Sequence, residues 1–207
     1  MYNWAIIFLS AGLSFLAFQN QSLLERLVLR PYWNLKKNNF LPLLTSGFIH
    51  ANWGHLIFNM FTLFFFGPPI EGALVYWYGA QMGGFLFVIF YVSGIIISNI
   101  PTFLKERGNP NYASLGASGA VSSILFASIL IMPLEQVCLF GLLCIPGFVF
   151  GPAFLLYSHY ASKDKRTLIN HDAHFYGALY GLLFILILKP SLLDNFYRQV
   201  LHYLQTL

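Results

Sequence analysis

Long uncharged stretches dominate the pattern of hydrophobic and polar positions along the chain. No Asp, Glu, Lys or Arg occurs in residues 1–24, 38–70, 72–104, 108–134 or 136–162. A helix needs roughly 20 apolar residues to cross the hydrocarbon core of a bilayer, whereas transmembrane strands would show alternating segments of about 10 residues. Because the uncharged stretches are continuous, the pattern predicts membrane-spanning α-helices.

The limits of these five stretches, together with the apolar run that ends at Leu188, predict six spans. We expect them at about Asn3–Asn20, Trp53–Gly67, Gln81–Ile100, Leu115–Met132, Gln136–Tyr160 and Asp172–Leu188. Proline removes a hydrogen bond from a helix interior, so the second span is expected to end before Pro68 and the fourth before Pro133. Pro146 and Pro152 predict a kink in the fifth span.

Two segments outside the spans mix charged and apolar residues. Residues 21–52 are too apolar for a solvated loop and too charged to span, which favours a structured segment embedded in the membrane interface. In the tail, apolar residues recur every three or four positions, at Leu193, Phe196, Val200 and Leu204. Ser191 with Asp194 resembles a capping box. We expect a core of residues 1–190, an amphipathic interfacial helix in 191–207, and no soluble domain.

Composition supports a membrane protein and excludes other classes. Charged residues are 9% of the chain and hydrophobic residues 57%, against about 25% charged in ordinary soluble proteins. Disordered proteins are likewise polar and highly charged. The net charge is only +4, without a basic stripe, so we expect no nucleic-acid partner. The two cysteines, Cys138 and Cys144, lie in an apolar run and are expected to be inert core residues.

Polar residues within predicted spans are the functional candidates, because ionisable groups are expensive in a membrane. His55 and Asn59 are four residues apart and share a helix face. Ser118 opens the fourth span, and His174 lies in the sixth. A serine nucleophile needs a base and donors for the oxyanion, and these residues could supply both.

Each of these features also has a purely structural interpretation. A membrane serine commonly bonds its own helix backbone, and a histidine–asparagine pair can hold helices together. Gly177 and Gly181 form a common packing motif. If the spans of Ser118 and His174 are in contact, we expect their backbones to approach through these glycines.

The residues in combination resemble the rhomboid family of intramembrane serine proteases, in a bacterial, six-span form. The family's His-x-x-x-Asn corresponds to His55–Asn59, and its Gly-x-Ser-Gly to Gly116-Ala117-Ser118-Gly119. Its Ala-His-x-x-Gly-x-x-x-Gly corresponds to residues 173–181. A further histidine upstream appears as His50, and a glutamate that closes the second span as Glu71.

The resemblance implies an all-α bundle of six transmembrane helices with an embedded first loop. It makes Ser118 the nucleophile and His174 the general base of a dyad. It assigns the oxyanion hole to His55, Asn59 and the backbone N–H groups of Ser118 and Ala117. Structural support would come from His50, Glu71, Gly116, Gly119, Gly177 and Gly181, with Glu71 fixing the loop after the second span. The implied partners are the lipid bilayer and transmembrane protein substrates, and no metal or cofactor is needed.

One departure and two rival functions accompany the resemblance. Many rhomboids carry an aromatic residue four positions after the serine, stacked on the histidine, whereas this chain has Ser122. We expect His174 to be held from elsewhere, for instance near Phe175 or Tyr176. The main rival function is a catalytically silent rhomboid-like protein that binds membrane clients, and a small channel or transporter is a third class.

Membrane orientation is indicated in two opposite ways. The loops after the first, third and fifth spans contain nine of the eleven basic residues: Arg26, Arg30, Lys36, Lys37, Lys105, Arg107, Lys163, Lys165 and Arg166. The positive-inside rule places these loops in the cytoplasm. The resemblance to bacterial rhomboids places them outside the bacterial inner membrane, and we favour that orientation because the first loop is expected to be embedded.

Overall fold

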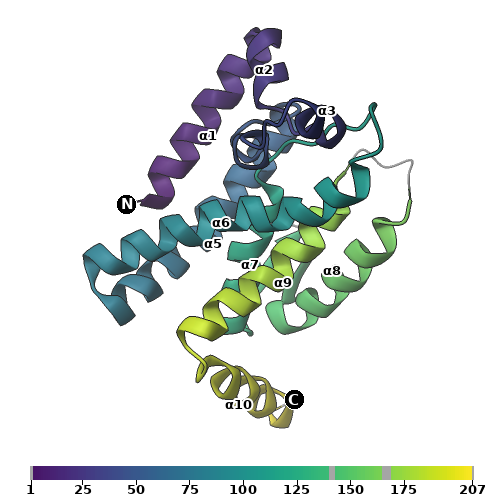
Figure 1. The fold of residues 1–207 in the computed structure, drawn as a ribbon. Helices are drawn as coiled ribbons and strands as arrows, with labels where there is room; N and C mark the ends of the chain where they lie inside the picture. The colour runs from purple at the N-terminus through teal and green to yellow at the C-terminus, as the bar shows by residue number, and fades with distance from the viewer. Residues whose placement is uncertain (1, 140–142, 165–168, 207) are drawn as a thin grey trace.

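A computed structural model of the protein describes residues 2–139, 143–164 and 169–206 and is mostly helical (Figure 1). The helices long and apolar enough to cross a membrane are α1 (Tyr2–Gln19), α5 (Trp53–Tyr78), α6 (Ala80–Glu106) and α9 (His171–Leu188). The protein is therefore a multi-pass membrane protein by helix length and composition. The bounds of α1 and α9 agree with the predicted first and sixth spans to within one residue at each end.

α7 (Ser118–Ile131) is shorter than a typical span and lies inside the bundle. Its 14 residues extend over about 21 Å at 1.5 Å per residue, against about 30 Å of hydrocarbon. Twelve of those residues, Gly119–Leu130, are buried. In contrast, α5 exposes a row of large apolar side chains, namely Ile57, Phe58, Phe61, Phe64 and Phe65. This pattern makes α7 an interior helix and α5 a helix with one lipid-facing side.

The prediction that α5 ends at Gly67 is wrong. The helix continues through Pro68 and Pro69 to Tyr78, and α6 likewise continues through Pro101. Proline is tolerated in membrane helices when neighbouring groups satisfy the freed backbone. Here the side chain of Asn3 packs against Gly67, directly before the prolines, and donates from Nδ2 to the Leu63 carbonyl at 3.2 Å, next to the carbonyls of Phe64 and Phe65 that lose their partners, so α1 holds α5 at this point.

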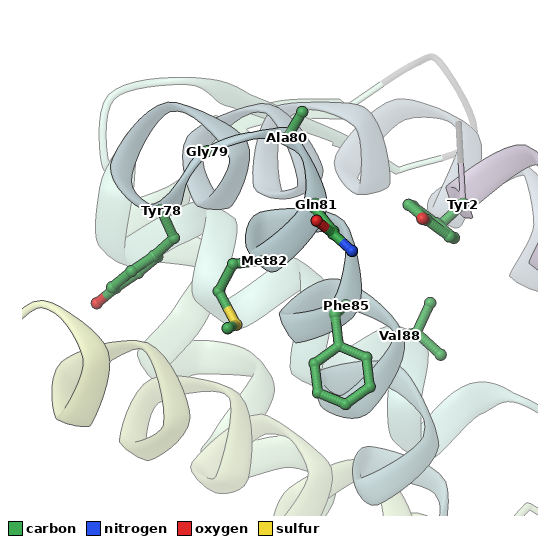
Figure 2. A pocket seen from close by; sticks show the side chains of 8 residues that line it. All are labelled: Tyr2, Tyr78, Gly79, Ala80, Gln81, Met82, Phe85 and Val88. Atoms are coloured by element: carbon green, nitrogen blue, oxygen red, sulfur yellow. The ribbon is translucent and has the colours of Figure 1, made fainter.

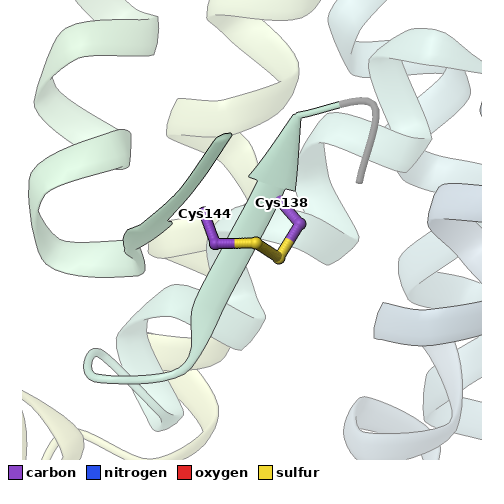
Figure 3. The surroundings of a disulfide bond; sticks show 2 residues. All are labelled: Cys138 and Cys144. Atoms are coloured by element: carbon purple, nitrogen blue, oxygen red, sulfur yellow. A yellow bond between two sulfur atoms is a disulfide. The ribbon is translucent and has the colours of Figure 1, made fainter. Parts of the chain in front are cut away.

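The predicted fifth span is also wrong, because its first half forms a hairpin. β1 (Gln136–Leu139) and β2 (Leu143–Pro146) are antiparallel and precede α8 (Gly147–Ala161). Cys138 pairs directly with Cys144 in the strand register, and a disulfide joins them (Figure 3). The cysteines are therefore cross-linked and not inert core residues. Their six-residue separation suits a hairpin, which an assumption of helical periodicity cannot reveal.

The segment between α1 and α5 is structured, as predicted. It contains α2 (Gln21–Leu27), α3 (Pro31–Lys36), α4 (Pro42–Thr45) and the 3₁₀ helix η1 (Ser46–Phe48). Leu29 and Ser114 exchange backbone hydrogen bonds of 3.0 and 2.9 Å, and Trp33 Nε1 donates to the Pro110 carbonyl at 3.0 Å. These bonds fix the first loop against the connection between α6 and α7.

The tail forms α10 (Leu192–Gln205), as its spacing predicts, but without the predicted capping box. Ser191 has helical backbone angles and its side chain makes no capping hydrogen bond. Asp194 instead pairs with Arg198 at 2.9 Å, one helical turn on. The helix packs beneath the bundle, where Gln199 Nε2 donates to the carbonyl of Ile131 at 3.4 Å.

Candidate active site

The two helices that carry Ser118 and His174 meet through their backbones. α7 and α9 form the most extensive contact between elements of the described chain, and they lie side by side in Figure 1. A Cβ atom added to Gly177 would lie 2.2 Å from the Gly119 carbonyl oxygen, and one added to Gly181 would lie 2.1 Å from the Ser123 carbonyl oxygen. The helices therefore approach through these glycines, as the spacing predicts, because no other residue fits.

Ser123 ties the same two helices together with a hydrogen bond. Its Oγ donates to the Gly177 carbonyl at 2.8 Å across the interface and to the Gly119 carbonyl at 3.0 Å within its own helix. Ser123 is fully buried. In lipid, where apolar burial gives little drive for helix association, such close packing and hydrogen bonding hold helices together.

Ser118 is the first residue of α7 and follows a turn that requires glycine. Gly116 has φ +124°, a conformation that side-chain-bearing residues rarely adopt. Its N–H donates to the Ser46 carbonyl at 2.9 Å. In the described chain no acceptor bonds the N–H of Ser118, which points out of the positive end of a helix. Ser118 is thus a half-buried residue beside a free backbone donor.

His174 lies in the first turn of α9, which a buried polar cluster caps. Asn170 Oδ1 accepts from Ala173 N at 3.1 Å and from Thr102 Oγ1 at 2.9 Å. Asn170 Nδ2 donates to Ser114 Oγ at 3.0 Å, four residues before Ser118. The cap therefore connects the start of α9 to α6 and to the loop that leads to Ser118.

No hydrogen bond joins Ser118 Oγ to the His174 ring within the described chain. What brings the residues together is the backbone: a Cβ atom on Gly119 would lie 3.4 Å from the Ala173 carbonyl oxygen. Each candidate residue is therefore next in sequence to a residue at this contact. Hydrogen bonds between catalytic groups are often long in free enzymes and tighten when substrate binds.

His55 and Asn59 lie on the first two turns of α5, beside the glycine turn. A Cβ atom on Gly116 would lie 2.7 Å from His55 Nε2, so the imidazole contacts this turn. Asn59 is buried, and its Nδ2 donates to the His55 carbonyl at 2.9 Å. That bond uses one of the two amide hydrogens. The structure thus brings His55 next to the loop of Ser118, with Asn59 directly below it.

His50 precedes α5 and supports the loop from outside the spans. It is fully buried, and its Nε2 accepts from Ala117 N at 3.3 Å while Nδ1 lies 2.9 Å from Ser14 Oγ. An accepting Nε2 leaves the proton of the neutral ring on Nδ1, which donates to Ser14. Burial, with a smaller contribution from His55, lowers the pKa of His50 to about 3. Because the Ala117 N–H is bonded to His50, it is not available as the oxyanion donor that the sequence suggested.

Glu71 supports a different element from the one predicted. Its carboxylate oxygens accept from the backbone N–H groups of Tyr2 at 2.8 Å and Asn3 at 3.0 Å. These are the first residues of α1, whose N–H groups lack partners within the helix. Glu71 therefore caps α1, and α5 continues past it as a helix. The prediction that it fixes a loop is wrong because no loop follows at that point.

The aromatic partner of His174 is Phe154, which the sequence did not identify. The two rings stack with centroids 6.2 Å apart and planes 27° from parallel. Phe154 lies on α8, while Phe175 and Tyr176 meet each other edge to face and do not contact the His174 ring in the described contacts. The contact joins two helices, so no spacing within one span could have revealed it.

A depression on the described surface lies at the other end of α5 from this site. It encloses about 860 Å³ at the turn between α5 and α6 and is lined by Tyr2, Tyr78, Gly79, Ala80, Gln81, Met82, Phe85 and Val88 (Figure 2). The lining holds no base beside a nucleophile. The described residues likewise contain no group of three His, Cys, Asp or Glu that could hold a metal ion.

Comparison with known proteins identifies the family. Residues 37–191 match the rhomboid domain. The chain is 28% identical over 170 residues to the presenilin-associated rhomboid-like protein, mitochondrial, of Mus musculus, covering 78% of this chain and 42% of that protein. It is 30% identical over 155 residues to Rhomboid-like protein 11, chloroplastic, of Arabidopsis thaliana, covering 70% and 51%. The chain thus spans about half the length of these relatives or less. Because the domain match covers most of the chain, the protein belongs to the rhomboid family.

Proposed function

We propose that the protein is an intramembrane serine endopeptidase that cleaves transmembrane or juxtamembrane segments of other membrane proteins. Ser118 is the nucleophile and His174 the general base of a dyad that needs no metal or cofactor. The observation that carries this proposal is the backbone contact of α7 with α9 at Gly119 and Gly177. That contact holds together the two helix ends that bear the reactive side chains.

The chemistry follows from these positions. His174 takes the proton of Ser118 Oγ as that oxygen attacks the scissile carbonyl, and later gives it to the departing amine. The oxyanion accepts hydrogen bonds from the Ser118 N–H, from His55 and from the second amide hydrogen of Asn59. His50 keeps Ala117 out of this set and fixes the loop in which Ser118 begins.

The substrate class follows from the position of the site in a membrane protein. A peptide bond within a helix is shielded by its neighbouring turns, and in lipid its carbonyl group must remain hydrogen-bonded. Cleavage therefore requires a segment that unwinds at the edge of the bilayer, and the family resemblance implies a small residue beside the scissile bond. Such a segment could present its carbonyl to Ser118.

The proposed architecture has six crossings, with α7 and α8 added to the four long helices. A short helix can serve as a crossing when surrounding helices shelter its ends, because non-helical backbone is tolerated at depth when protein buries it. Residues 1–190 would form the protease core and 191–207 an interfacial tail. The proposed location is a bacterial inner membrane, although the relatives named above carry mitochondrial and chloroplastic in their names.

Replacement of the nucleophile tests the proposal directly. Wild-type protein, Ser118→Ala and His174→Ala are reconstituted in liposomes with a reporter transmembrane substrate and a fluorophosphonate probe. We expect both variants to lose cleavage by several orders of magnitude, because dyad members act as a unit. Ser122→Ala is the matched control, since this buried serine lies one turn further along the same helix, and it should keep wild-type cleavage.

Two outcomes would overturn the proposed function. Full cleavage by Ser118→Ala would exclude the serine mechanism. Equal binding of the reporter substrate by wild type and Ser118→Ala, with no cleavage and no probe labelling of either, would instead identify a catalytically silent rhomboid-like protein that binds membrane clients.

A further inference from the structure

We propose that Phe154 is a positioning residue for His174, an inference that rests on the function proposed above. The Phe154 ring stacks on the imidazole with its plane inclined by 27° and 6.2 Å between centroids. A general base must hold its nitrogen toward the nucleophile. A flat ring stacked on the imidazole restricts its rotation without competing for its nitrogen atoms.

Phe154 is itself fixed by rings on two sides. It contacts Phe126 of α7 at 5.6 Å and Phe150, one turn upstream on α8, at 5.5 Å between centroids. The stack therefore runs from the helix of Ser118, through α8, to His174. A ring held by α7 and by its own helix can transmit the relative position of these two helices to the imidazole.

A second aromatic residue of α8, Tyr157, contacts His171, which in turn contacts His174. His171 meets the His174 ring edge-on at 5.7 Å, and Tyr157 meets His171 at 5.4 Å. Phe154 and Tyr157 are three residues apart and share one face of α8. This face of α8 thus contacts His174 through Phe154 and contacts His171 through Tyr157.

The residue at position 122 explains why α8 supplies the ring. Ser122 lies four residues after Ser118, on the same face of α7, and its small side chain is buried. A hydroxymethyl group offers no surface on which an imidazole can stack. In this chain the ring comes from another helix.

The test compares Phe154→Ala and Phe154→Tyr with Phe150→Ala in liposomes. We expect Phe154→Ala to lower kcat by about 10- to 100-fold with KM nearly unchanged, since displacement of a reacting group by about 1 Å can cost 100-fold. Phe154→Tyr keeps the stack and should restore most of kcat. Phe150→Ala removes an equal volume from the same apolar cluster but leaves the Phe154–His174 contact in place, so its kcat should fall by much less than that of Phe154→Ala.

The outcomes separate positioning from packing and from the parent proposal. Equal losses of kcat in Phe154→Ala and Phe150→Ala, with equal falls in melting temperature, would reduce Phe154 to a packing residue. A faster Phe154→Ala enzyme would mean that the ring obstructs the site, and would also overturn the inference. Either result with an inactive Ser118→Ala leaves the serine mechanism intact, whereas an active Ser118→Ala removes the parent proposal itself.

A separate observation concerns the direction in which the site faces. The connections after α1, α6 and α8 contact one another: Trp33 bonds Pro110, and Lys105 Nζ binds both the Ser162 carbonyl at 3.1 Å and Asp172 at 2.6 Å. We call the end of the bundle formed by these connections the first-loop face. It includes the starts of α5, α7 and α9, and hence Ser118 and His174.

The opposite end of the bundle, which we call the hairpin face, has a different character. It contains the β1–β2 hairpin, α10 and the end of α9, where the Tyr78 hydroxyl donates to the Leu188 carbonyl at 2.6 Å. It carries the disulfide between exposed residues Cys138 and Cys144. Among the basic residues that the structure describes, the first-loop face has seven and the hairpin face has two, Lys189 and Arg198.

From these two features we infer that the first-loop face, with the candidate site, lies on the reducing, cytoplasm-like side of the membrane. Basic residues in short loops are retained on that side, and disulfides persist on the oxidising side. The two rules are independent and give the same orientation. It is opposite to the one that the bacterial resemblance favours. The preferred substrates would then be segments whose scissile bond lies near the cytoplasmic end of a span.

Reporter fusions to the end of α10 test the orientation, because α10 belongs to the hairpin face. Alkaline phosphatase needs its own disulfides and is active only outside the cytoplasm, while a green fluorescent protein fusion of the usual kind fluoresces only within it. We expect an active phosphatase fusion and a dark fluorescent fusion. The reverse result, or signal from both, would overturn the inference. The same fusions on Ser118→Ala should behave identically, so the result is independent of the proposed activity.

Discussion

Two of the helices that pack against α7, namely α8 and α9, are attached to it by different means. α9 meets α7 backbone to backbone at Gly177 and Gly181, while α8 contacts it through rings such as Phe154 and Phe126. An interface without intervening side chains cannot adjust when atoms are added, whereas a contact between rings can shift. The comparison teaches that the α7–α9 contact sets the distance between Ser118 and His174, and that α8 refines the orientation of His174.

Gly181→Val places a branched side chain in the rigid interface between α7 and α9, and should have the largest effect on cleavage. Its side chain would enter the space of the Ser123 carbonyl, 2.1 Å from the added Cβ. Overpacking costs typically 1–3 kcal/mol, and the displacement of His174 should lower cleavage in liposomes by more than about 100-fold. Gly72→Val is the control, because a Cβ at Gly72 meets nothing within 4 Å. Wild-type cleavage by Gly181→Val would show that the two backbones are not in contact.

Asn59→Ala asks whether α5, a third helix, also contributes to the chemistry. Loss of one oxyanion donor costs about 2.7–4 kcal/mol in transition-state stabilisation in a soluble protease. Because the Ser118 N–H and His55 remain, we expect a fall in kcat of about 100-fold or less. If both Asn59→Ala and His55→Ala cleave at the wild-type rate, the pair serves packing alone.

His50→Gln tests the support of the loop through its pH dependence. His50 has a pKa of about 3 in the folded protein and about 6.5 when unfolded. Its contribution to stability is therefore complete above pH 6.5 and is lost as the pH falls toward 3. The wild type should lose up to about 2 kcal/mol between pH 6.5 and pH 5, at about 1.4 kcal/mol per unit. Glutamine keeps a donor and an acceptor but does not titrate, so the variant's thermal unfolding should depend less on pH. Parallel pH curves for the two proteins would contradict this role.

Removal of the disulfide tests the adjustable contact, in which α8 meets α7 through aromatic rings. It should have the smallest effect on activity. Closing a loop of about seven residues contributes about 2 kcal/mol in the chain-entropy estimate. The double variant Cys138→Ser, Cys144→Ser should therefore melt at a lower temperature in detergent yet retain kcat, since the hairpin lies at the opposite end of the bundle. Reductant should destabilise the wild type but not the double variant. A large loss of kcat would mean that the hairpin holds α8, and with it Phe154, in register.

Residues that act within one helix could be read from the sequence. The spacings of His55 with Asn59 and of Gly177 with Gly181 express the geometry of a single helix, and the glycines also indicated where α7 and α9 approach if the two helices are in contact. Continuous uncharged runs likewise predicted α1 and α9 almost to the residue. Local rules sufficed for these because each depends on neighbours three or four positions away.

Features that depend on a partner from elsewhere in the chain could not be read this way. Pro68 does not end α5, because tertiary contacts support the helix beyond it. The Cys138–Cys144 pair required a strand register, and the Phe154–His174 stack required the position of a second helix. Glu71 was recognised as important, but its partners are the backbone N–H groups of α1, which have no side-chain signature at all.

The burial of α7 has a consequence for how the sequence can change over time. Twelve of its 14 residues are enclosed, so nearly every substitution there must fit neighbours on all sides at once. On the outer face of α5, one large apolar residue can replace another and still meet only lipid. A saturation library scored for cleavage should therefore accept few replacements along α7 and many at Phe61 or Phe65. Neutral substitutions should therefore accumulate mainly on the outer side of the bundle.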